Sequence, residues 1–191
     1  GLLAGKITIS VVSTGKYVIP YFLSDFVNNH AGVDFSIDVT SKTKVLNSLV
    51  KNETDFALVS VLPKNLPIEK IELMDNKLYL VGKEKPTEKK VSNKALQEMR
   101  FLFREEGSAT RNAMENFLKT RDIKISKLEM QSNEAIKQAV CAGLGYSIMP
   151  LIGMTEELKS GKIHIISCEG LPISTSWNLI YNKSKRLSPA A

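Results

Sequence analysis

Five segments at the start of the chain alternate between the hydrophobic period of a strand and that of a helix. Residues 6–13, 34–40 and 55–61 carry apolar side chains at every second position or in a short continuous run, as strands do. Between them, residues 16–28 and 43–51 repeat apolar side chains at helical spacing. This order predicts a parallel sheet with right-handed helical crossovers. The chain is therefore expected to have an α/β fold.

A second series of the same kind follows a charged connection at residues 83–94. This connection leads to a helix capped by Ser92. The later strands are expected at 101–103, 127–131, 146–149, 162–167 and 174–182, and the later helices at 108–118, 133–142 and 150–161. The two halves share a parallel-sheet pattern, and ligands of open α/β sheets bind outside the carboxyl ends of the strands.

Polar residues follow four of these strands directly, where the chain turns into the next helix. They are Ser13 and Thr14; Ser41, Lys42 and Thr43; Gly107, Ser108 and Thr110; and Ser132 with Asn133. Each group taken alone is explained as a helix N-cap. Two groups in each half could instead converge on one cleft. Hydroxyls and helix N-termini, with the cations Lys16, Lys42, Arg104 and Arg111 nearby, suit a carboxylate, sulfate or phosphate.

No catalytic or metal-binding motif accompanies these groups. The STGK sequence at 13–16 resembles the end of a phosphate-binding loop, but that motif needs glycine at position 10 and Ser or Thr at 17. The chain has Ser10 and Tyr17 there, and it contains no HExxH, GxSxG or GxGxxG. Cys141 and Cys168 lack zinc-site spacing and are expected to be buried thiols in a reducing compartment. We therefore expect no enzyme activity, catalytic residue, metal or cofactor.

The charge and hydropathy of the chain limit the functions that remain possible. The formal charge is +6, from 26 Lys and Arg against 20 acidic residues, but no run of five basic residues occurs. A nucleic-acid surface would more often show clustered charge with interleaved aromatics. The net positive charge would favour the binding of an anionic small molecule as well as that of a nucleic acid. Apolar runs are too short for a membrane span and no signal peptide is evident, so a cytoplasmic location is expected.

The chain resembles the effector-binding domain of LysR-type transcriptional regulators over essentially its whole length. The most specific match is SNEAIKQAVCAGLGYSIMP at 132–150. Supporting matches are residues 2–33, NETDFALV at 52–59, REEGSATRNAMENFL at 104–118 and LSPAA at 187–191. The closest similarity is to the branch that includes regulators of carbon fixation and of sulfur or nitrogen assimilation. Members carry an N-terminal winged helix-turn-helix that this sequence lacks, and residues 1–5 resemble the end of the connection to it.

The resemblance implies two Rossmann-like subdomains of the periplasmic-binding-protein type II kind, joined by two crossover strands. Subdomain I would comprise 1–82 plus 167–191, and subdomain II 83–166. An inducer or corepressor would bind in the cleft between them, in contact with the four polar groups named above. The resemblance also implies dimers or tetramers, in which the first subdomain of one chain meets the second of another. DNA would be bound only through the missing N-terminal domain.

Two other functions compete with a ligand-sensing regulatory domain. A solute-binding protein for transport would have a similar fold, although the missing signal peptide counts against it. A transferase or lyase of similar architecture, such as a porphobilinogen-deaminase-like or prephenate-dehydratase-like domain, would need a catalytic set that the sequence does not contain.

Overall fold

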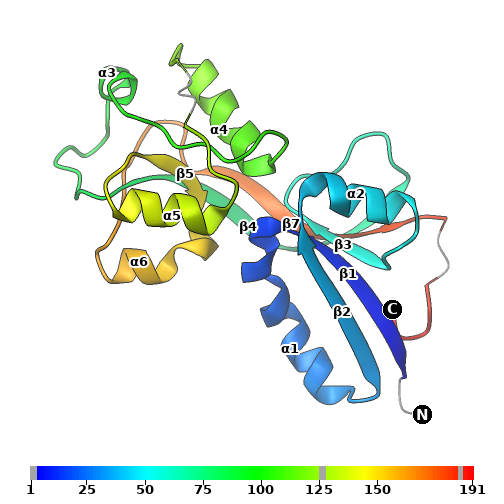
Figure 1. Cartoon of the computed structure of the whole chain (residues 1–191). Coiled ribbons are helices and arrows are strands. Elements are labelled where there is room, and N and C mark those ends of the chain that lie inside the picture. The colour runs from blue at the N-terminus through cyan, green and yellow to red at the C-terminus, as the bar shows by residue number, and fades with distance from the viewer. Residues whose placement is uncertain (1–3, 125–127, 185–186) are drawn as a thin grey trace. The chain divides into compact units, whose positions relative to one another are not determined.

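The computed structural model describes residues 4–124, 128–184 and 187–191, which pack as two units (Figure 1). Unit 1 comprises Gly1–Asp75 and Thr175–Ala191, and unit 2 comprises Asn76–Ser174. The chain passes between the units along β4 (Ile68–Gly82) and β7 (Ile173–Asn182), which are neighbours in the sheet. Two subdomains joined by two crossover strands are thus confirmed. Residues 1–3 of the expected connection and Lys127 of an expected strand lie outside the described residues.

Unit 1 has the predicted parallel sheet. Its elements are β1 (Gly5–Val12), the 3-10 helix η1 (Ser13–Tyr17), α1 (Ile19–Asn29), β2 (Val33–Thr40), α2 (Lys42–Val50) and β3 (Phe56–Val59). β1 pairs in parallel with both β2 and β3, and β7 closes this part of the sheet as an antiparallel neighbour of β3. Asp55 fixes the register of β3, because its carboxylate accepts hydrogen bonds from the Thr8 backbone N–H at 2.9 Å and the Thr8 hydroxyl at 3.2 Å.

The two helices of unit 1 cover opposite faces of its sheet (Figure 1). Val45 and Leu49 of α2 form one apolar cluster with Ala57 and Val59 of β3 and with Ile180 of β7. Side chains of α1 line a shared apolar pocket with the other face of the sheet, where Ile7 and Ile9 lie. This is the arrangement that strands with a period of two produce when both faces are covered.

The first helix differs from the expectation of one helix over 16–28. A 3-10 turn occupies Ser13–Tyr17, and the α-helix begins only at Ile19, with Pro20 in its first turn. Gly15 explains the separate turn. A Cβ atom at this position would lie 2.4 Å from Val11 Cγ1 and 3.1 Å from Leu58 Cδ2, so only glycine lets the turn pack this closely on the strands.

Unit 2 contains a second strand and helix series. Its elements are α3 (Asn93–Gln97), α4 (Ala109–Lys119), α5 (Asn133–Cys141), β5 (Ser147–Pro150), η2 (Leu151–Gly153), α6 (Thr155–Lys159) and β6 (His164–Ile165). β5 and β6 both pair antiparallel with β4. The strands expected at 101–103 and 127–131 are reduced to isolated parallel bridges, Phe101 with Tyr146 and Phe103 with Glu129. The predicted parallel pairing of strands is therefore present in only part of this unit.

The packing of the connecting strands explains where the units divide. Leu78 and Leu80 of β4 belong to the same apolar cluster as Phe101 and Phe103, and Cys168 joins them. These residues therefore pack in unit 2, whereas the sequence boundaries at 82/83 and 166/167 assign Leu78, Leu80 and Cys168 to the first subdomain. β4 runs for 15 residues, so it belongs to unit 1 at its start and to unit 2 at its end. The boundaries of the functional subdomains stay a prediction.

A buried lysine joins α5 to the region of α6 in unit 2. Lys137 Nζ donates to the Gly153 carbonyl at 3.1 Å and forms ion pairs with Glu134 and Glu157, each at 3.1 Å. Burial lowers the pKa of Lys137, but the hydrogen bonds and charges of the two glutamates outweigh it, so the pKa lies above its ordinary value.

Unfolding measurements in alkali should reveal this ion-pair cluster. A pKa raised in the folded state gives stability that is complete below the unfolded pKa, near 10.5, and is lost as the pH rises through the folded pKa. Lys137→Met should therefore show a shallower fall of unfolding free energy above that pH than the unchanged chain. Urea denaturation across alkaline pH measures this slope. Lys119→Met, at an exposed ion pair, is the control, and equal slopes in all three proteins would contradict the assignment.

Candidate functional site

The polar groups of unit 1 leave the sheet at one edge. Val12, the last residue of β1, pairs in parallel with Thr40, the last residue of β2. Ser13 and Ser41 are the next residues of these two strands. Because β1 and β2 run in parallel and end in register, the segments 13–14 and 41–43 start side by side. The polar groups that follow β1 and β2 therefore start from the same edge of the sheet, and their convergence on a ligand cleft stays a prediction.

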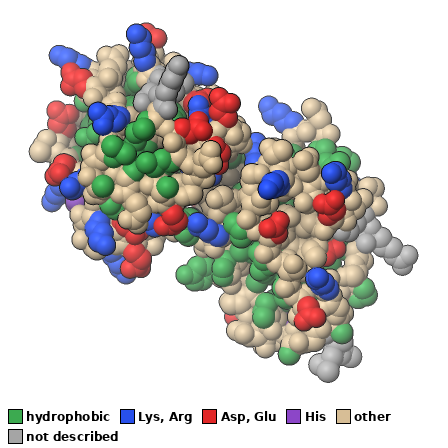
Figure 2. Space-filling model, in the orientation of Figure 1, with side chains coloured by type: hydrophobic (Ala, Val, Ile, Leu, Met, Phe, Trp, Pro, Cys, Tyr) green, Lys and Arg blue, Asp and Glu red, His purple; other side chains and the backbone are tan. Residues whose placement is uncertain are grey.

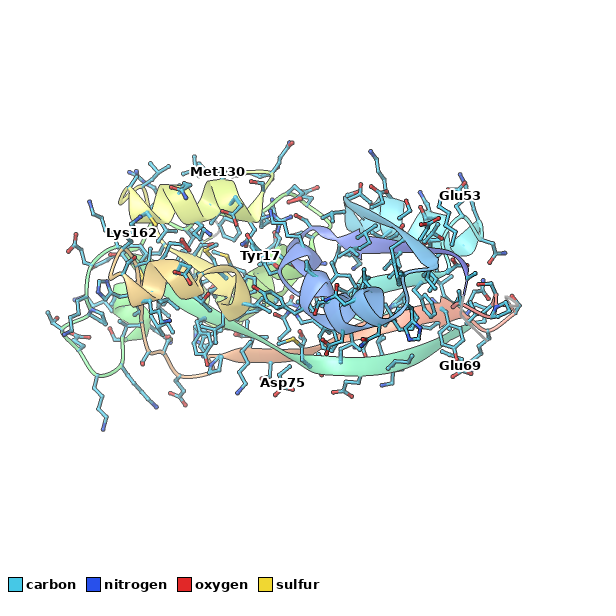
Figure 3. All side chains as sticks on the ribbon, turned by 90° about the horizontal axis from the view of Figure 1, so that it is seen from below. Tyr17, Glu53, Glu69, Asp75, Met130 and Lys162 are labelled. Atoms are coloured by element: carbon cyan, nitrogen blue, oxygen red, sulfur yellow. The ribbon has the colours of Figure 1, made fainter. Side chains whose placement is uncertain are left out.

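Ser13 and Thr14 are not helix caps. The 3-10 turn that they open has Val12 at its N-cap position, with no side-chain cap hydrogen bond. Within the described residues, neither hydroxyl has a hydrogen-bond partner, although Thr14 is only 6% exposed. Tyr17 ends this turn and is labelled in Figure 3. For this group the alternative explanation as a cap is therefore removed.

Ser41 is an N-cap, as the alternative interpretation held. Its hydroxyl accepts from the Lys44 N–H of α2 at 3.3 Å. Lys42 and Thr43 are the first two helical residues. Helical geometry gives their N–H groups no partner inside the helix, so these donors remain for solvent or a ligand. Thr43 is exposed and Lys42 is half-buried.

Unit 2 also brings its two polar groups to one edge. The Phe103 N–H donates to the Leu128 carbonyl at 3.0 Å, and the Met130 N–H donates back to the Phe103 carbonyl at 2.8 Å. Met130 is labelled in Figure 3. The two segments run in parallel here, so the chain leaves both toward the same edge. It continues to 107–110 from the first segment and to 132–133 from the second.

The turn at 107–110 places a capped helix start at this edge. Gly107 has a φ of +86°, a left-handed conformation that glycine adopts without strain. Ser108 caps α4, with its hydroxyl accepting from the Arg111 N–H at 3.0 Å. Ser132 caps α5 in the same way, accepting from the Ala135 N–H at 2.9 Å. Thr110 is the second residue of α4, as Thr43 is of α2, so Ser-x-Thr starts a helix in both units.

The arginines at this edge are engaged in ion pairs. Arg104, only 5% exposed, forms a two-point contact with Glu105, at 2.6 Å and 3.1 Å. Arg111 pairs with Glu115 at 2.7 Å and also with Glu129, and its pKa lies above the ordinary value because of these hydrogen bonds. Neither cation is therefore free to compensate a ligand charge. Among the described residues Lys16 and Lys42 form no ion pair, which leaves them as the candidate cations.

Two residues that the sequence analysis did not select lie near this edge of unit 1. Ser60 directly follows β3 and is 8% exposed, and the β1–β3 register brings it beside Ser13. The sequence analysis expected this strand to run to residue 61, so Ser60 fell inside it and the rule of a hydroxyl after a strand missed it. Asn178 of β7 pairs with Val59 and is 5% exposed. Its side-chain oxygen is buried without a hydrogen-bond partner among the described residues, and only the pairing of β3 with β7 could reveal this.

The expected site residues thus form two sets. Unit 1 gathers Ser13, Thr14, Ser41, Lys42 and Thr43, and unit 2 gathers Gly107, Ser108, Thr110, Ser132 and Asn133. Asn133 is 1% exposed, so its side chain is largely inaccessible from solvent. That the two sets bind one ligand stays a prediction.

The two thiol groups lie in the described part of the chain. It contains no group of three or more His, Cys, Asp or Glu side chains arranged to hold a metal ion. Both cysteines are free, and Cys168 is buried as expected, whereas Cys141 is half-buried, which corrects the expectation for that residue. Burial raises the pKa of the Cys168 thiol above its ordinary value. No described helix is both long and apolar enough to cross a membrane.

Comparisons with known proteins agree with this architecture. The model of the LysR substrate binding domain matches residues 1–191. The RuBisCO operon transcriptional regulator of Allochromatium vinosum is 37% identical over 195 residues, which cover 100% of this chain and 65% of the relative. The transcriptional activator CmpR of Synechocystis is 35% identical, with 100% and 64% covered. The chain thus spans just under two thirds of the length of these relatives.

Solved structures with the same fold include ligand complexes. The regulatory domain of CcmR from Synechocystis PCC6803, in complex with 2-PG, superposes with a TM-score of 0.89 at 29% identity, covering 97% of this chain and 91% of that chain. The effector binding domain of QuiR in complex with shikimate gives 0.83 at 19% identity, covering 98% and 92%, which shows a shared fold.

Proposed function

Because this chain belongs to the family of LysR substrate binding domains, we propose that it is the effector-sensing part of a LysR-type transcriptional regulator, with a small anionic metabolite as its effector. The observation that carries this proposal is the pair of Ser-x-Thr helix starts at the carboxyl edges of the two units. Helix N-termini and hydroxyls bind carboxylate or phosphate oxygens well, and Lys42 adds a positive charge that no described acid neutralises.

The effector contacts the two sets of polar residues together. Thr43 and Thr110 offer hydroxyls, the first N–H groups of α2 and α4 offer donors, and Ser13 and Thr14 offer hydroxyls with no described partner. Since CcmR, at 29% identity, binds 2-PG, this compound is the first candidate to test. Catalysis is not part of the proposal, because the relatives are transcriptional regulators.

The Ser108→Ala variant distinguishes a role of Ser108 in effector binding from its role as a helix cap. Ser108 and Ser92 each cap a helix, at 3.0 Å and 3.1 Å, so replacing either by alanine should reduce stability by about 1 kcal/mol. Only Ser108→Ala should also weaken 2-PG binding, by about tenfold, because one hydrogen bond to a charged group is removed. Isothermal titration calorimetry measures affinity, and urea denaturation measures stability.

The comparison between these two variants decides the outcome. Equal affinities in the Ser108→Ala, Ser92→Ala and unchanged proteins would remove Ser108 from the site. Thr43→Val and Thr110→Val complete the test, because valine preserves the shape of threonine and neither hydroxyl has a described hydrogen bond. If 2-PG does not bind, the same titration is repeated with phosphorylated sugars and sulfur metabolites, and failure of all of them would overturn the anionic effector.

Regulation by the intact protein follows from differential binding. A ligand shifts a conformational equilibrium only by the difference in its affinity for the two states. We infer that the effector binds one arrangement of the two units more tightly and that this difference reaches a DNA-binding region outside this chain, in the cytoplasm. A reporter assay with the intact regulator should lose induction with Ser108→Ala and keep it with Ser92→Ala. The alternative of a transport solute-binding protein is set aside, because the relatives are transcriptional regulators.

Self-association is the second part of this proposal. α1 exposes Tyr21 at 81%, Phe22 at 40% and Val27 at 41%, and Figure 2 shows hydrophobic side chains gathered over this helix. β2 lies at the edge of the sheet and exposes Ile37 and Val39 at 41% and 43%. Such contiguous apolar surface is typical of protein interfaces. A second copy of the chain covers this surface.

Tyr21→Lys should weaken this association. A lysine charge buried in an apolar interface costs free energy without a partner, so the dimer dissociation constant should rise at least about tenfold. Sedimentation equilibrium measures the constant. Asn47→Lys, at an exposed position of α2 on the opposite face of the sheet, is the control for added charge. A monomeric unchanged chain at all concentrations would contradict association through this domain alone.

A further inference from the structure

A basic pocket lies in unit 2, away from the polar residues of the effector proposal. Its volume is about 450 Å³, and its lining includes Lys83, Lys85, Lys162, His164, Cys141 and Glu84. Pockets of roughly 300–1,000 Å³ are of the size that small ligands occupy. Lys162 is labelled in Figure 3. Three lysines face a single glutamate in this lining, so its formal charge is positive.

Ordered elements bring these residues together. β4 ends at Gly82, which pairs with His164 of β6, so Lys83 and His164 are held beside each other. Lys83 lies over the end of α5, since a Cβ atom added to Gly143 would be 3.1 Å from Lys83 Cδ. Gly161, with a φ of +73°, turns the chain into Lys162. The basic residues thus come from two separate segments, 83–85 and 162–164, and do not form a continuous basic run.

The lysines of this pocket differ from three largely buried cations of unit 2. Arg104, Arg111 and Lys137 are all neutralised by glutamates. Among the described residues, Lys83, Lys85 and Lys162 form no ion pair. Cations that converge on a concave surface without acidic partners raise the local concentration of anions and can contact one anion together.

His164 adds a proton-accepting group to the pocket. Its Nδ1 lies 3.0 Å from the Lys83 carbonyl oxygen, which can only accept a hydrogen bond, so Nδ1 carries the proton. Nε2 is then the nitrogen that takes up a second proton.

We propose that this pocket is a second anion site, for a phosphate-bearing small molecule, separate from the effector site. Phosphate fits the observations because two or three ammonium groups and an imidazole donor can share its oxygens. The site lies at the C-terminal end of α5, whereas Ser132 and Asn133 lie at the N-terminal end of the same helix. The proposal does not rest on the effector proposal, since it uses none of the same residues.

Nuclear magnetic resonance of the 191-residue chain tests the site, because the sequence contains 2 histidines. Inorganic pyrophosphate is titrated at constant pH and ionic strength, and the imidazole signals of each histidine are followed. The His164 signals should shift saturably. His30, which packs against Phe26 in unit 1, should stay unchanged and serves as the internal control. Parallel titrations with glucose 6-phosphate and sulfate distinguish an organic phosphate, inorganic phosphate and any divalent anion.

Matched variants and a second readout complete the test. Lys83→Gln with Lys162→Gln should raise the pyrophosphate dissociation constant about tenfold, because two cationic contacts are lost. Lys70→Gln with Lys94→Gln removes the same charge from exposed positions outside the pocket and should leave the constant unchanged. Bound pyrophosphate should also slow alkylation of Cys141 by iodoacetamide in the unchanged protein. Ser108→Ala should keep all of these effects, even if the effector proposal fails.

Three results would overturn the site. The first is equal movement of the His164 and His30 signals, which would indicate ionic screening alone. The second is an equal loss of affinity in the two lysine double variants. The third is a linear shift without saturation at pyrophosphate concentrations up to tens of millimolar, combined with unchanged alkylation of Cys141.

Discussion

Gly15→Val should destabilise unit 1 by about 3 kcal/mol, because overpacked side chains force strands or rotamers to move. The first carbon atom of the new side chain would lie 2.4 Å from Val11 Cγ1. Val11 is fully buried and β-branched, so it has no other conformation available at low cost. The 13–17 turn would lift from the sheet, and Ser13 and Thr14 would move with it. Urea denaturation measures the loss, and effector affinity should fall in parallel.

A double-mutant cycle separates this clash from a general effect of substitution. Gly15→Ala alone should cost about 2 kcal/mol, and Val11→Ala alone removes two buried methyl groups and also destabilises. The double variant should be more stable than the sum predicts, because the smaller residue at 11 makes room for the Cβ atom at 15. Strict additivity would show that the close approach at Gly15 is not what holds the turn.

Arg111→Met should destabilise unit 2 by about 3 kcal/mol, because removing one member of a partly buried ion-pair network leaves the other charges uncompensated. Arg111 is 13% exposed and contacts three segments. It pairs with Glu115 of α4, pairs with Glu129, and donates to the Arg104 carbonyl at 2.9 Å. These bonds join the start of α4 to both neighbouring segments. The variant should therefore also weaken effector binding, although Arg111 has no charge left for a ligand.

Glu115 has a second ion-pair partner, Lys119, which supplies the control for Arg111. Lys119 pairs with Glu115 at 3.9 Å on an exposed face, so Lys119→Met should change the stability by less than about 0.5 kcal/mol. Adding Glu115→Gln to Arg111→Met should recover part of the loss, because one unpaired charge is removed. Equal effects of Arg111→Met and Lys119→Met on unfolding would show that the network is an ordinary surface contact.

The helices and their caps were predictable because both depend on local sequence. Ser41, Ser92, Ser108 and Ser132 each cap the helix that follows, as expected for a hydroxyl before an amphipathic segment. The start of α1 was misplaced, since the sequence around Ser13 suggests a helix start while the packing of Gly15 on the strands imposes a 3-10 turn. A local sequence pattern contains no information about the packing of Gly15 against Leu58, which is distant in the sequence.

Burial was less predictable than secondary structure. Phe22 and Val27 of α1 follow the expected apolar stripe, as do Ile37 and Val39 of β2, yet all four remain about 40% exposed or more. The spacing of apolar residues in the sequence shows only which side of a helix or strand is apolar. Whether a neighbour covers that side depends on the order of strands in the sheet, and β2 is at its edge.

The α/β fold, the hydroxyl-bearing turns after the strands and the resemblance to LysR effector-binding domains could all be predicted, because each depends on consecutive residues. Which of those turns share an edge depends instead on strand pairing, namely that of Val12 with Thr40 and of Phe103 with Glu129. The tertiary structure also decided which cations are free: Arg104 and Arg111 are neutralised by glutamates, while Lys42 and the lysines around His164 are not. Ion pairs form between residues that folding brings together, so the charge available to a ligand depends on the fold.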